Sequence, residues 1–217
     1  MPENVSWLNN LHIEAIVFDL GNVIIPVDFD RTVRAFTQLG GKKASELYHY
    51  KGQTKLFEEL ERGEITRKEF LTRVRPELDH ASDTEIVDAW NAMLYDLDHS
   101  TFEYLDRLRP RFKTFILSNI NTFHAEWVEN AMHHSSPHVN ISHYFDFVFY
   151  SHEIGCRKPE YGAWQCIMDK EHINPQKTLF IDDKEENIEA AKALGFIGLL
   201  WNPMHDIRSV VDILLPS

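Results

Sequence analysis

Five short apolar runs, rich in β-branched and aromatic residues, are spaced along the chain. They are Ile13–Phe18, Thr114–Leu117, Phe147–Tyr150, Thr178–Ile181 and Ile197–Trp201. Most are continuous rather than alternating, which is typical of parallel strands covered on both faces. Three helical patterns lie between the later runs, at Thr122–Met132, Glu160–Glu171 and Glu185–Leu194. Strands that alternate with helices predict a doubly wound, Rossmann-like parallel α/β sheet.

The ends of these helices carry recognisable signals. Pro159 is suited to the first turn of the second helix, because its missing N–H costs nothing there. Gly195 is suited to the C-terminal cap of the third, where a left-handed backbone conformation is common.

The region between the first two strands, from about residue 28 to residue 108, contains no convincing strand. It contains three capping-box patterns ahead of apolar stripes, which begin at Thr66, Ser82 and Ser100. We therefore expect a small helical cap at residues 28–100, inserted into an α/β core formed by residues 11–27 and 101–217. The helix from about Thr101 would return the chain to the sheet.

Composition and charge limit the classes of partner. The 217 residues include 22 Lys and Arg against 34 Asp and Glu, so the formal net charge is -12. An acidic protein repels nucleic-acid backbones and anionic membranes, so we expect neither as a partner. An anionic substrate would need cations concentrated at one place. The sequence makes no prediction of the oligomeric state.

The two cysteines, Cys156 and Cys166, form no metal-ligand pattern and fit a reducing compartment better than a disulfide scaffold. The N-terminal residues show no basic region followed by an apolar run, and no window has the length of a transmembrane helix. The expected location is the cytoplasm.

Polar residues follow four of the predicted strands, where open parallel sheets bind their ligands. They are Asp19 after the first strand, Ser118 and Asn119 after the second, Lys158 after the third, and Asp182 and Asp183 after the fourth. Each alone has an ordinary explanation: a strand-end Asp or Ser often caps a helix, and a Lys is usually solvated. Four such strand ends together favour one polar crevice.

This set of groups is suited to phosphoryl transfer. A carboxylate such as Asp19 can attack phosphorus and form an aspartyl-phosphate. Mg²⁺ prefers carboxylates, a carbonyl, water and phosphate oxygens, so Asp19, Asp183, Asp182 and the backbone carbonyl near Gly21 are its candidate ligands. Ser118 can donate a hydrogen bond to phosphate, and Lys158 can stabilise the charge that grows in the transition state.

Four motifs of the chain resemble those of the haloacid dehalogenase-like hydrolase superfamily. They are the segments 16–23, 116–119, 157–159 and 180–187, and the resemblance extends from about residue 13 to about residue 201. The segment Phe57–Thr66 also resembles the cap helix and turn of a branch that includes glucose-1-phosphate phosphatases. The resemblance implies a Mg²⁺-dependent phosphatase that acts on a small phosphorylated metabolite, with a sugar phosphate favoured.

The resemblance also implies a role for each matching residue. Asp19 would be the nucleophile, and Gly21 would offer a carbonyl to Mg²⁺. Asp183 would bind the metal directly, with Asp182 in support, and Asn187 could orient a metal-bound water. Ser118, Asn119 and Lys158 would bind the phosphate, and Lys158 would also shield its charge. Val23–Val27 would form a small flap that leads into the cap.

One position departs from the family pattern. Most phosphatases of this superfamily carry a second Asp two residues after the nucleophile, as general acid and base, whereas this chain has Gly21. Asp28, Asp30, Asn22, His124 or a cap residue could take that role, and the sequence does not choose among them. The same Asp-Leu-Gly-Asn form occurs in the glucose-1-phosphate phosphatase-like branch.

Two other functions stay open beside the phosphatase. A dehalogenase would use the same Asp to attack a carbon that bears a halogen, but it needs neither Mg²⁺ nor the Asp182–Asp183 pair. A catalytically weakened phosphate-binding or regulatory protein is supported only by Gly21. Selectivity would lie in the cap, where Tyr48, His49, Phe57, Trp90 and Tyr95 are candidates, although packing of the cap core is the expected role of most of them.

Overall fold

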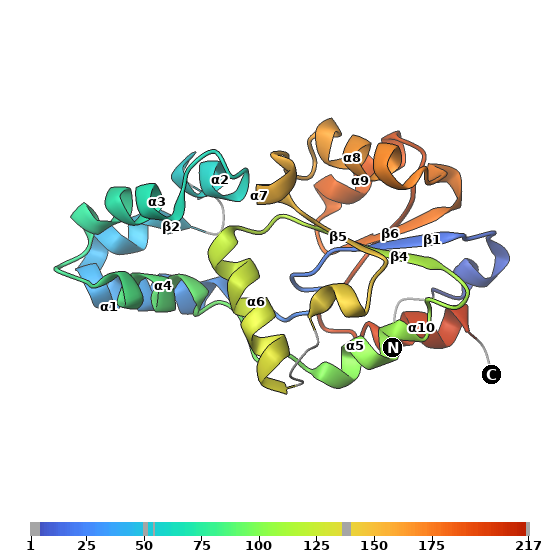
Figure 1. Ribbon diagram of the computed structural model, residues 1–217, viewed down its shortest axis with the longest axis horizontal. Coiled ribbons are helices and arrows are strands. Elements are labelled where there is room, and N and C mark those ends of the chain that lie inside the picture. Colours follow the sequence, from blue (N-terminus) through green and yellow to red (C-terminus); the bar gives the residue numbers. More distant parts are fainter. Residues whose placement is uncertain (1–4, 50–51, 54, 136–139, 216–217) are drawn as a thin grey trace.

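The structure, a computed structural model, describes residues 5–49, 52–53, 55–135 and 140–215. An α/β part and a helical part lie side by side along the longest axis of the molecule (Figure 1). In the described residues, no helix combines the length and the apolar character that crossing a membrane would require.

The α/β part contains a five-stranded sheet in the order β5-β4-β1-β6-β7, in which every pairing is parallel. Its strands are β1 (Ala15–Phe18), β4 (Lys113–Ser118), β5 (Phe147–Tyr150), β6 (Thr178–Asp182) and β7 (Ile197–Leu200). Each matches one of the five predicted runs to within two residues. The predicted doubly wound α/β fold is confirmed.

Successive residues of each strand enter two different cores, which explains why the strands are apolar throughout. In β1, Ile16 and Phe18 face one core, whereas Ala15 and Val17 face the other. The first core is closed by helices α5 (His99–Asp106), α6 (Thr122–Ser135) and α10 (Arg208–Leu214). The second is closed by α8 (Tyr161–Glu171) and α9 (Glu185–Ala193). Figure 1 shows α8 and α9 on one face of the sheet and α5 and α10 on the other.

The helical part has a third core of its own, built around Phe36, Phe57, Phe70 and Trp90. Its helices are α1 (Phe29–Leu47), α2 (Lys55–Glu61), α3 (Arg67–Val74) and α4 (Asp83–Asn91). Phe123 of α6 also packs into this core, with its ring centroid 5.6 Å from that of Phe70. The helical insertion therefore has a separate core that leans on α6, while the exact boundaries at residues 28 and 100 stay a prediction.

Two of the three predicted capping boxes are present. The side chains of Thr66 and Ser82 each accept a hydrogen bond from a backbone N–H, and Glu69 and Glu85 return the bond. The third prediction was wrong. Asp98 caps α5 instead of Ser100, because its carboxylate accepts from the backbone N–H of Ser100 and so starts the helix earlier.

The other helix-end predictions have mixed outcomes. Pro159 precedes the N-cap Glu160 of α8, so its predicted place in the first helical turn was wrong by two residues. Gly195 follows α9 with a φ of 92°, and its N–H donates to the carbonyl of Lys192. This is the left-handed geometry expected of a helix-terminating glycine.

The expectation of a strand-free insertion was also wrong in detail. A two-stranded antiparallel sheet joins β2 (Tyr48–His49) to β3 (Gly52–Gln53). Strands of two residues are too short to produce a period-2 pattern that a sequence could reveal. The remaining elements are short: α7 (Ser151–Ile154) and the 3₁₀ turns Val5–Asn10, Arg75–Glu77, Ile141–His143 and Pro175–Lys177.

The chain passes between the two parts twice, and the two crossings are hydrogen-bonded to each other. Val27 on the way out forms an antiparallel bridge with Leu94 on the way back. The N–H of Asp28 donates to the carbonyl of Met93 at 2.8 Å. The crossings therefore form one paired connection at the edge of the cap.

Candidate active site

All predicted site residues except the fully buried Asp182 line one cavity at the carboxyl ends of the sheet strands. Its lining includes Asp19 after β1, Ser118 and Asn119 after β4, and Asp183 after β6. Lys158, from the loop between α7 and α8, lies on the same wall, together with Gly21 and Asn187. The volume of the cavity is about 90 Å³. The sheet topology thus brings together residues from opposite ends of the sequence, as predicted from the strand order.

Lys158 is held between two carboxylates. Its Nζ lies 2.8 Å from Oδ1 of Asp19 and 2.7 Å from Oδ2 of Asp182, and the residue is 3% exposed. Burial lowers the pKa of Lys158, but the neighbouring Asp182 and Asp19 outweigh it and the net shift is upward. The lysine is therefore charged, and it joins the first and fourth strand ends.

The carboxylates around it form a concentrated negative site. Burial raises the pKa of Asp19 to about 6, with Lys158 opposing the shift and Asp182 adding to it. Burial also raises the pKa of Asp183, against the hydrogen bond from Asn22. One oxygen each of Asp19, Asp182 and Asp183 lie within 4.8 Å of one another. Three carboxylates against one lysine leave excess negative charge that a divalent cation would neutralise.

Asp182 is already saturated with donors. Its Oδ1 accepts from the backbone N–H of Lys184 at 2.8 Å, and Asn187 Nδ2 donates to both of its oxygens at 3.0 Å. Lys158 supplies a further bond to Oδ2. These bonds favour a supporting position for Asp182, and they leave Asp183 as the more available metal ligand.

Asn187 fits a place beside a metal-bound water. It lines the cavity and is 1% exposed, while its Oδ1 finds no hydrogen-bond partner among the described residues. A buried acceptor without a partner is costly, so this oxygen needs a donor from within the cavity. A water held by a cation would supply that donor. The residues present therefore fit a hydrated Mg²⁺.

The loops after the strands are fixed by side-chain bonds to the backbone. Asn119 Nδ2 donates to the carbonyl of Lys158 at 2.8 Å, and Asn119 Oδ1 accepts from the N–H of Lys158 at 2.8 Å. The Oγ of Ser151 bonds both the N–H and the carbonyl of Ile120. Asn119 lines the cavity as predicted, but its amide is committed to positioning the lysine. Ser118, 4% exposed, keeps its hydroxyl at the cavity wall.

The segment after Asp19 turns sharply and is tied to the metal-ligand candidate. Asn22 has a φ of 58°, its N–H donates to the carbonyl of Ile25, and its Nδ2 donates to Asp183 at 3.1 Å. Its Oδ1 accepts from the N–H of Val27 at 3.0 Å. Asn22 thus connects residues 23–27 to the end of β6, while their role as a flap stays a prediction.

A search of family models matches residues 13–195 to the haloacid dehalogenase-like hydrolase family. The chain belongs to that family. The predicted resemblance is confirmed over more than four fifths of the sequence, and with it the prediction that the protein is a hydrolase.

The hydrolase is similar to one characterised relative along nearly its whole length. A D-ribitol-5-phosphate phosphatase of Bacteroides thetaiotaomicron is 32% identical over 210 residues, which span 94% of this chain and 100% of the relative. A solved structure of a HAD family enzyme from the same organism, in complex with magnesium and inorganic phosphate, superposes with a TM-score of 0.81 at 31% identity. It covers 89% of this chain and 96% of that one.

A second solved structure extends the fold similarity. A predicted HAD-like family hydrolase from Porphyromonas gingivalis superposes with a TM-score of 0.84 at 28% identity, covering 95% of this chain and 99% of that one. The cap and the core of the hydrolase therefore have the same overall arrangement as in these relatives.

His124, one of the candidates for the missing general acid, is held in a neutral state. His124 is buried, its Nε2 donates to the carbonyl of Trp90 at 3.2 Å, and its Nδ1 then accepts from Asn121. Burial lowers the pKa of His124 to about 4, so the ring is neutral at pH 7 with both nitrogens engaged. His124 is thus unsuited to protonating a leaving group.

The other candidates do not supply an acid at the cavity either. Asp28 accepts from the N–H of Asp30 at the start of α1 and bonds Arg34, and neither aspartate belongs to the cavity lining in the described residues. Asn22 lines the cavity, but an amide cannot donate a proton in catalysis. Of the candidates that the sequence offered, only a cap residue is left.

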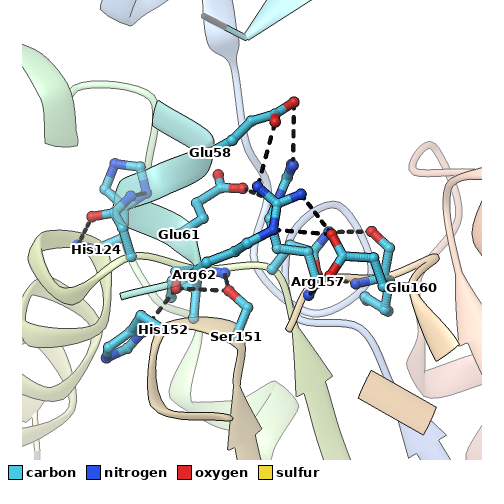
Figure 2. Close-up of polar contacts among 12 residues, drawn as sticks. Glu58, Glu61, Arg62, His124, Ser151, His152, Arg157 and Glu160 are labelled. Carbon is cyan, nitrogen blue, oxygen red and sulfur yellow. Dashed lines mark hydrogen bonds and ion pairs between the residues drawn. The ribbon is translucent and has the colours of Figure 1, made fainter. Parts of the chain in front are cut away.

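The cap contributes to the cavity one charged residue, Glu61, that the sequence motifs did not single out. Glu61, at the end of α2, lines the cavity and lies 2.7 Å from Arg157 through its Oε2. Figure 2 shows this pair between the cap helix and the loop before Lys158. The only sequence signal for Glu61 was the resemblance of the segment Phe57–Thr66 to a cap helix and turn. That resemblance indicated the correct helix but no particular residue.

The turn after Glu61 explains how the cap comes so close. Gly63 has a φ of 67°, and a Cβ at this position would lie 2.3 Å from the carbonyl oxygen of His152 in α7. Only glycine permits this approach of the two backbones. His152 in turn bonds the carbonyl of Ile120 through its Nδ1, so the contact point is tied to the end of β4.

The residues predicted to govern selectivity are mostly structural. Phe57 is 0% exposed in the cap core, and Trp90 is 1% exposed but also lines the cavity. Tyr95 is 43% exposed and lies under the guanidinium of Arg31 at 4.5 Å. Tyr48 and His49 form β2, and their side chains lie outside what the structure describes.

Proposed function

We propose that the protein is a Mg²⁺-dependent phosphomonoester hydrolase that acts on a small sugar or polyol phosphate through an aspartyl-phosphate intermediate. The observation that carries the proposal is the buried Asp19–Lys158–Asp182 arrangement at the strand ends, with Asp183 beside it. The relative named as a D-ribitol-5-phosphate phosphatase supports a polyol or sugar phosphate as the substrate. The relative solved with magnesium and inorganic phosphate supports Mg²⁺ as the cofactor and a phosphate-bearing ligand.

Each residue has a step in this reaction. Asp19 attacks phosphorus, and the leaving alkoxide departs, so that the phosphoryl group is carried on the Asp19 carboxylate. Lys158 and the Ser118 hydroxyl stabilise the negative charge of the transferring group. Water then attacks the aspartyl-phosphate and releases inorganic phosphate. Asp19, Asp183 and the carbonyl of Gly21 would hold Mg²⁺, which shields the anionic nucleophile from the anionic substrate when bound.

The position of Asp182 supports an indirect role in this scheme. Because its oxygens accept bonds from Lys158, Lys184 and Asn187, we assign it to holding the lysine and the metal-site loop. Asn119 likewise positions Lys158, in addition to its predicted part in substrate binding. The acidic net charge of -12 supports a small-molecule substrate over nucleic acid or anionic lipid. The cytoplasmic location stays a prediction.

A chelator experiment tests the proposal against its two alternatives. Purified protein is assayed for phosphate release from sugar and polyol phosphates with Mg²⁺, with EDTA, and with Mg²⁺ restored in excess. We expect activity that EDTA abolishes and Mg²⁺ restores. Activity that persists in EDTA would favour a metal-independent mechanism such as dehalogenation, and binding of phosphate without turnover would favour a regulatory protein.

Two matched variants sharpen the metal assignment. Asp183→Ala removes a proposed ligand, whereas Asn187→Ala removes a group that bonds Asp182 and that we expect to bond a metal-held water. Loss of an indirect partner typically costs about 10- to 100-fold in metal affinity. We expect the Mg²⁺ concentration for half-maximal activity to rise more for Asp183→Ala than for Asn187→Ala. The reverse order would contradict the assignment of Asp183.

A further inference from the structure

The Glu61–Arg157 pair lies inside the catalytic cavity, although its two residues come from different parts of the molecule. The side chains are 8% and 15% exposed, and Nε of Arg157 lies 2.7 Å from Oε2 of Glu61. Arg157 also lies 3.5 Å from Oε1 of Glu58, one helical turn earlier in α2. Glu61 and Arg157 both line the cavity, whereas Glu58 is outside the set of described lining residues.

Holding the cap against the core does not require a buried ion pair at this place. A neighbouring pair already joins the two parts, because Arg62 bonds Glu160 at 2.6 Å and 3.0 Å outside the cavity (Figure 2). Burying charges costs desolvation free energy, and well-packed apolar residues of similar volume often hold a structure as well or better. A carboxylate kept inside the cavity therefore indicates a role in what the cavity binds.

The rest of the cavity shows what Glu61 would meet. The wall opposite the strand ends is largely apolar and includes Val27, Phe29, Trp90, Met93 and Leu94. On the strand-end side, Lys158 is already shared between Asp19 and Asp182. Arg157, on the cap side, is shared between Glu61 and Glu58. At the strand-end side, where phosphate would bind, the lysine is therefore already paired with carboxylates. The opposite side presents an apolar surface and the carboxylate of Glu61.

This arrangement fits an uncharged, hydroxyl-bearing leaving group. A carboxylate accepts hydrogen bonds from hydroxyl groups, and charge-assisted bonds of this kind are strong. The carbon backbone of a polyol can lie against the apolar wall. A leaving group with its own carboxylate or second phosphate would face Glu61 as a like charge, with Arg157 already occupied by two glutamates.

We infer that Glu61, oriented by Arg157, is a specificity-determining residue that accepts hydrogen bonds from the hydroxyls of an uncharged polyol or sugar leaving group and rejects esters that carry a second anionic group. The inference rests on the proposed phosphatase function and adds the recognition of the leaving group to it. The role that we assign to Glu61 is binding of the leaving group, not stabilisation of the transferring phosphoryl group.

A matched substrate pair tests the inference. Ribitol 5-phosphate and 5-phosphoribonate have the same carbon chain, but the second carries a carboxylate in place of a terminal hydroxymethyl group. The ratio of their kcat/KM values is measured for the wild-type protein, Glu61→Gln and Glu58→Gln. A hydrogen bond to a charged group is worth about 10- to 100-fold in such a ratio. We expect the wild type to prefer the polyol and Glu61→Gln to lose about tenfold or more of that preference.

The Glu58→Gln variant is the control, because it removes a carboxylate that contacts the same Arg157 from outside the cavity. It should keep the wild-type ratio. Equal ratio changes in the two variants, or an unchanged ratio in Glu61→Gln, would overturn the inference and reduce Glu61 to a contact between cap and core. Should Glu61→Gln fail to fold because Arg157 is left unpaired, the Glu61→Gln/Arg157→Gln double variant should show the same loss of preference.

Nitrophenyl phosphate separates this inference from the proposed function. It carries neither hydroxyls nor a second anion, so wild-type turnover of this ester tests the phosphatase chemistry alone. If the wild type hydrolyses it but shows no preference for ribitol 5-phosphate over 5-phosphoribonate, the inference on Glu61 is wrong and the proposed function stands. If the wild type hydrolyses none of the three esters, both are overturned.

Discussion

On the sheet side of the cavity three charged groups are joined to one another, whereas on the cap side one carboxylate, Glu61, is paired with Arg157 beside a largely apolar wall. Asp19, Lys158 and Asp182 are joined by contacts of 2.7 and 2.8 Å. The cap side is the outer surface of an aromatic core in which Phe57 and Trp90 rings lie 4.6 Å apart. The first region is fixed by charge and hydrogen bonds, and the second by packing. Changes on the sheet side should therefore affect chemistry, and changes on the cap side should affect stability and choice of substrate.

The largest effect is expected for Asp19→Asn. The amide has nearly the same shape but is a poor nucleophile, so turnover should fall by roughly 10⁴-fold or more. Removing one buried negative charge from an acidic cluster should leave the fold intact. Phosphate release and a thermal melt of the same preparation check both points. Near wild-type turnover would remove Asp19 from the nucleophile role and overturn the proposed reaction.

Lys158→Ala should come next. Electrostatic stabilisers of a transition state are worth about 10²- to 10³-fold in kcat, and the loss should appear chiefly in kcat rather than in KM. Lys177→Ala is a matched control, because Lys177 forms an exposed ion pair with Glu14 far from the cavity. Since the substitution leaves Asp19 and Asp182 without their cation, a melting curve must accompany the kinetics. A raised KM with unchanged kcat would take Lys158 out of the catalytic set.

His124, between cap and core, should make the protein sensitive to acid. Its pKa falls from 6.5 to about 4 on burial, so between these values the unfolded chain binds a proton that the folded chain does not. Stability should therefore fall as the pH drops through this window, by about 3 kcal/mol at most. Urea unfolding at pH 7.5 and pH 5 measures the difference.

Two variants isolate the contribution of His124. His124→Gln removes the titrating ring and should lose less stability between the two pH values than the wild type does. His134→Gln, on the exposed side of the same helix α6, should follow the wild type. An identical pH dependence in wild type and His124→Gln would show that other groups govern acid unfolding.

The smallest effect is expected at Gly21, and it concerns the leaving group. A Cβ at this position would meet only Cγ2 of Val27 at 3.4 Å, which is an ordinary contact, so Gly21→Asp should fold. Without a general acid, esters with good leaving groups are favoured. The new carboxyl should narrow the rate gap between nitrophenyl and alkyl phosphates by about tenfold, towards the lower end of what general acids contribute.

Gly21→Ala is the control for this substitution, because it fills the same space without a carboxyl group. It should leave the rate gap as it is in the wild type. If the wild-type rate does not depend on the basicity of the leaving group, an acid is already present and the reading of Gly21 is wrong. If both rates fall together in Gly21→Asp, the carboxylate interferes with the existing arrangement.

The sheet side was also the more predictable region from sequence. Its strands are buried on both faces, so they are apolar without interruption, and the polar residues that follow them stand out. Parallel topology then requires Asp19, Ser118 and Asp183 to meet at one edge. Local rules worked at Thr66 and Ser82 for the same reason, because a capping box involves only four consecutive residues. They failed at Ser100, because Asp98 accepts from the N–H of Ser100, which the side chain of Glu103 would have to bond in a capping box.

The cap side could not be predicted in the same way. The Glu61–Arg157 contact joins residues that are far apart in the chain, and nothing in the local sequence of either marks the partner. The two-residue strands β2 and β3 are too short to leave a pattern. The position of Glu61 also depends on how α2 meets α7, which is set by packing between two cores rather than by propensity. Tertiary contacts of this kind appear only when both parts are in place.

Gly63 lets the cap stand close to the core, because this residue has no Cβ. Because the carbonyl of His152 would stand 2.3 Å from a Cβ there, even a methyl group would act as a wedge between the cap and the core. Such a side chain would move the end of α2 away from the core, and with it Glu61, which lines the cavity beside the leaving group. Substitution of Gly63 is therefore one way in which a related enzyme could admit bulkier esters while the residues at the strand ends stay the same. The cost would be a looser seal against water and the strain of a side chain at a φ of 67°.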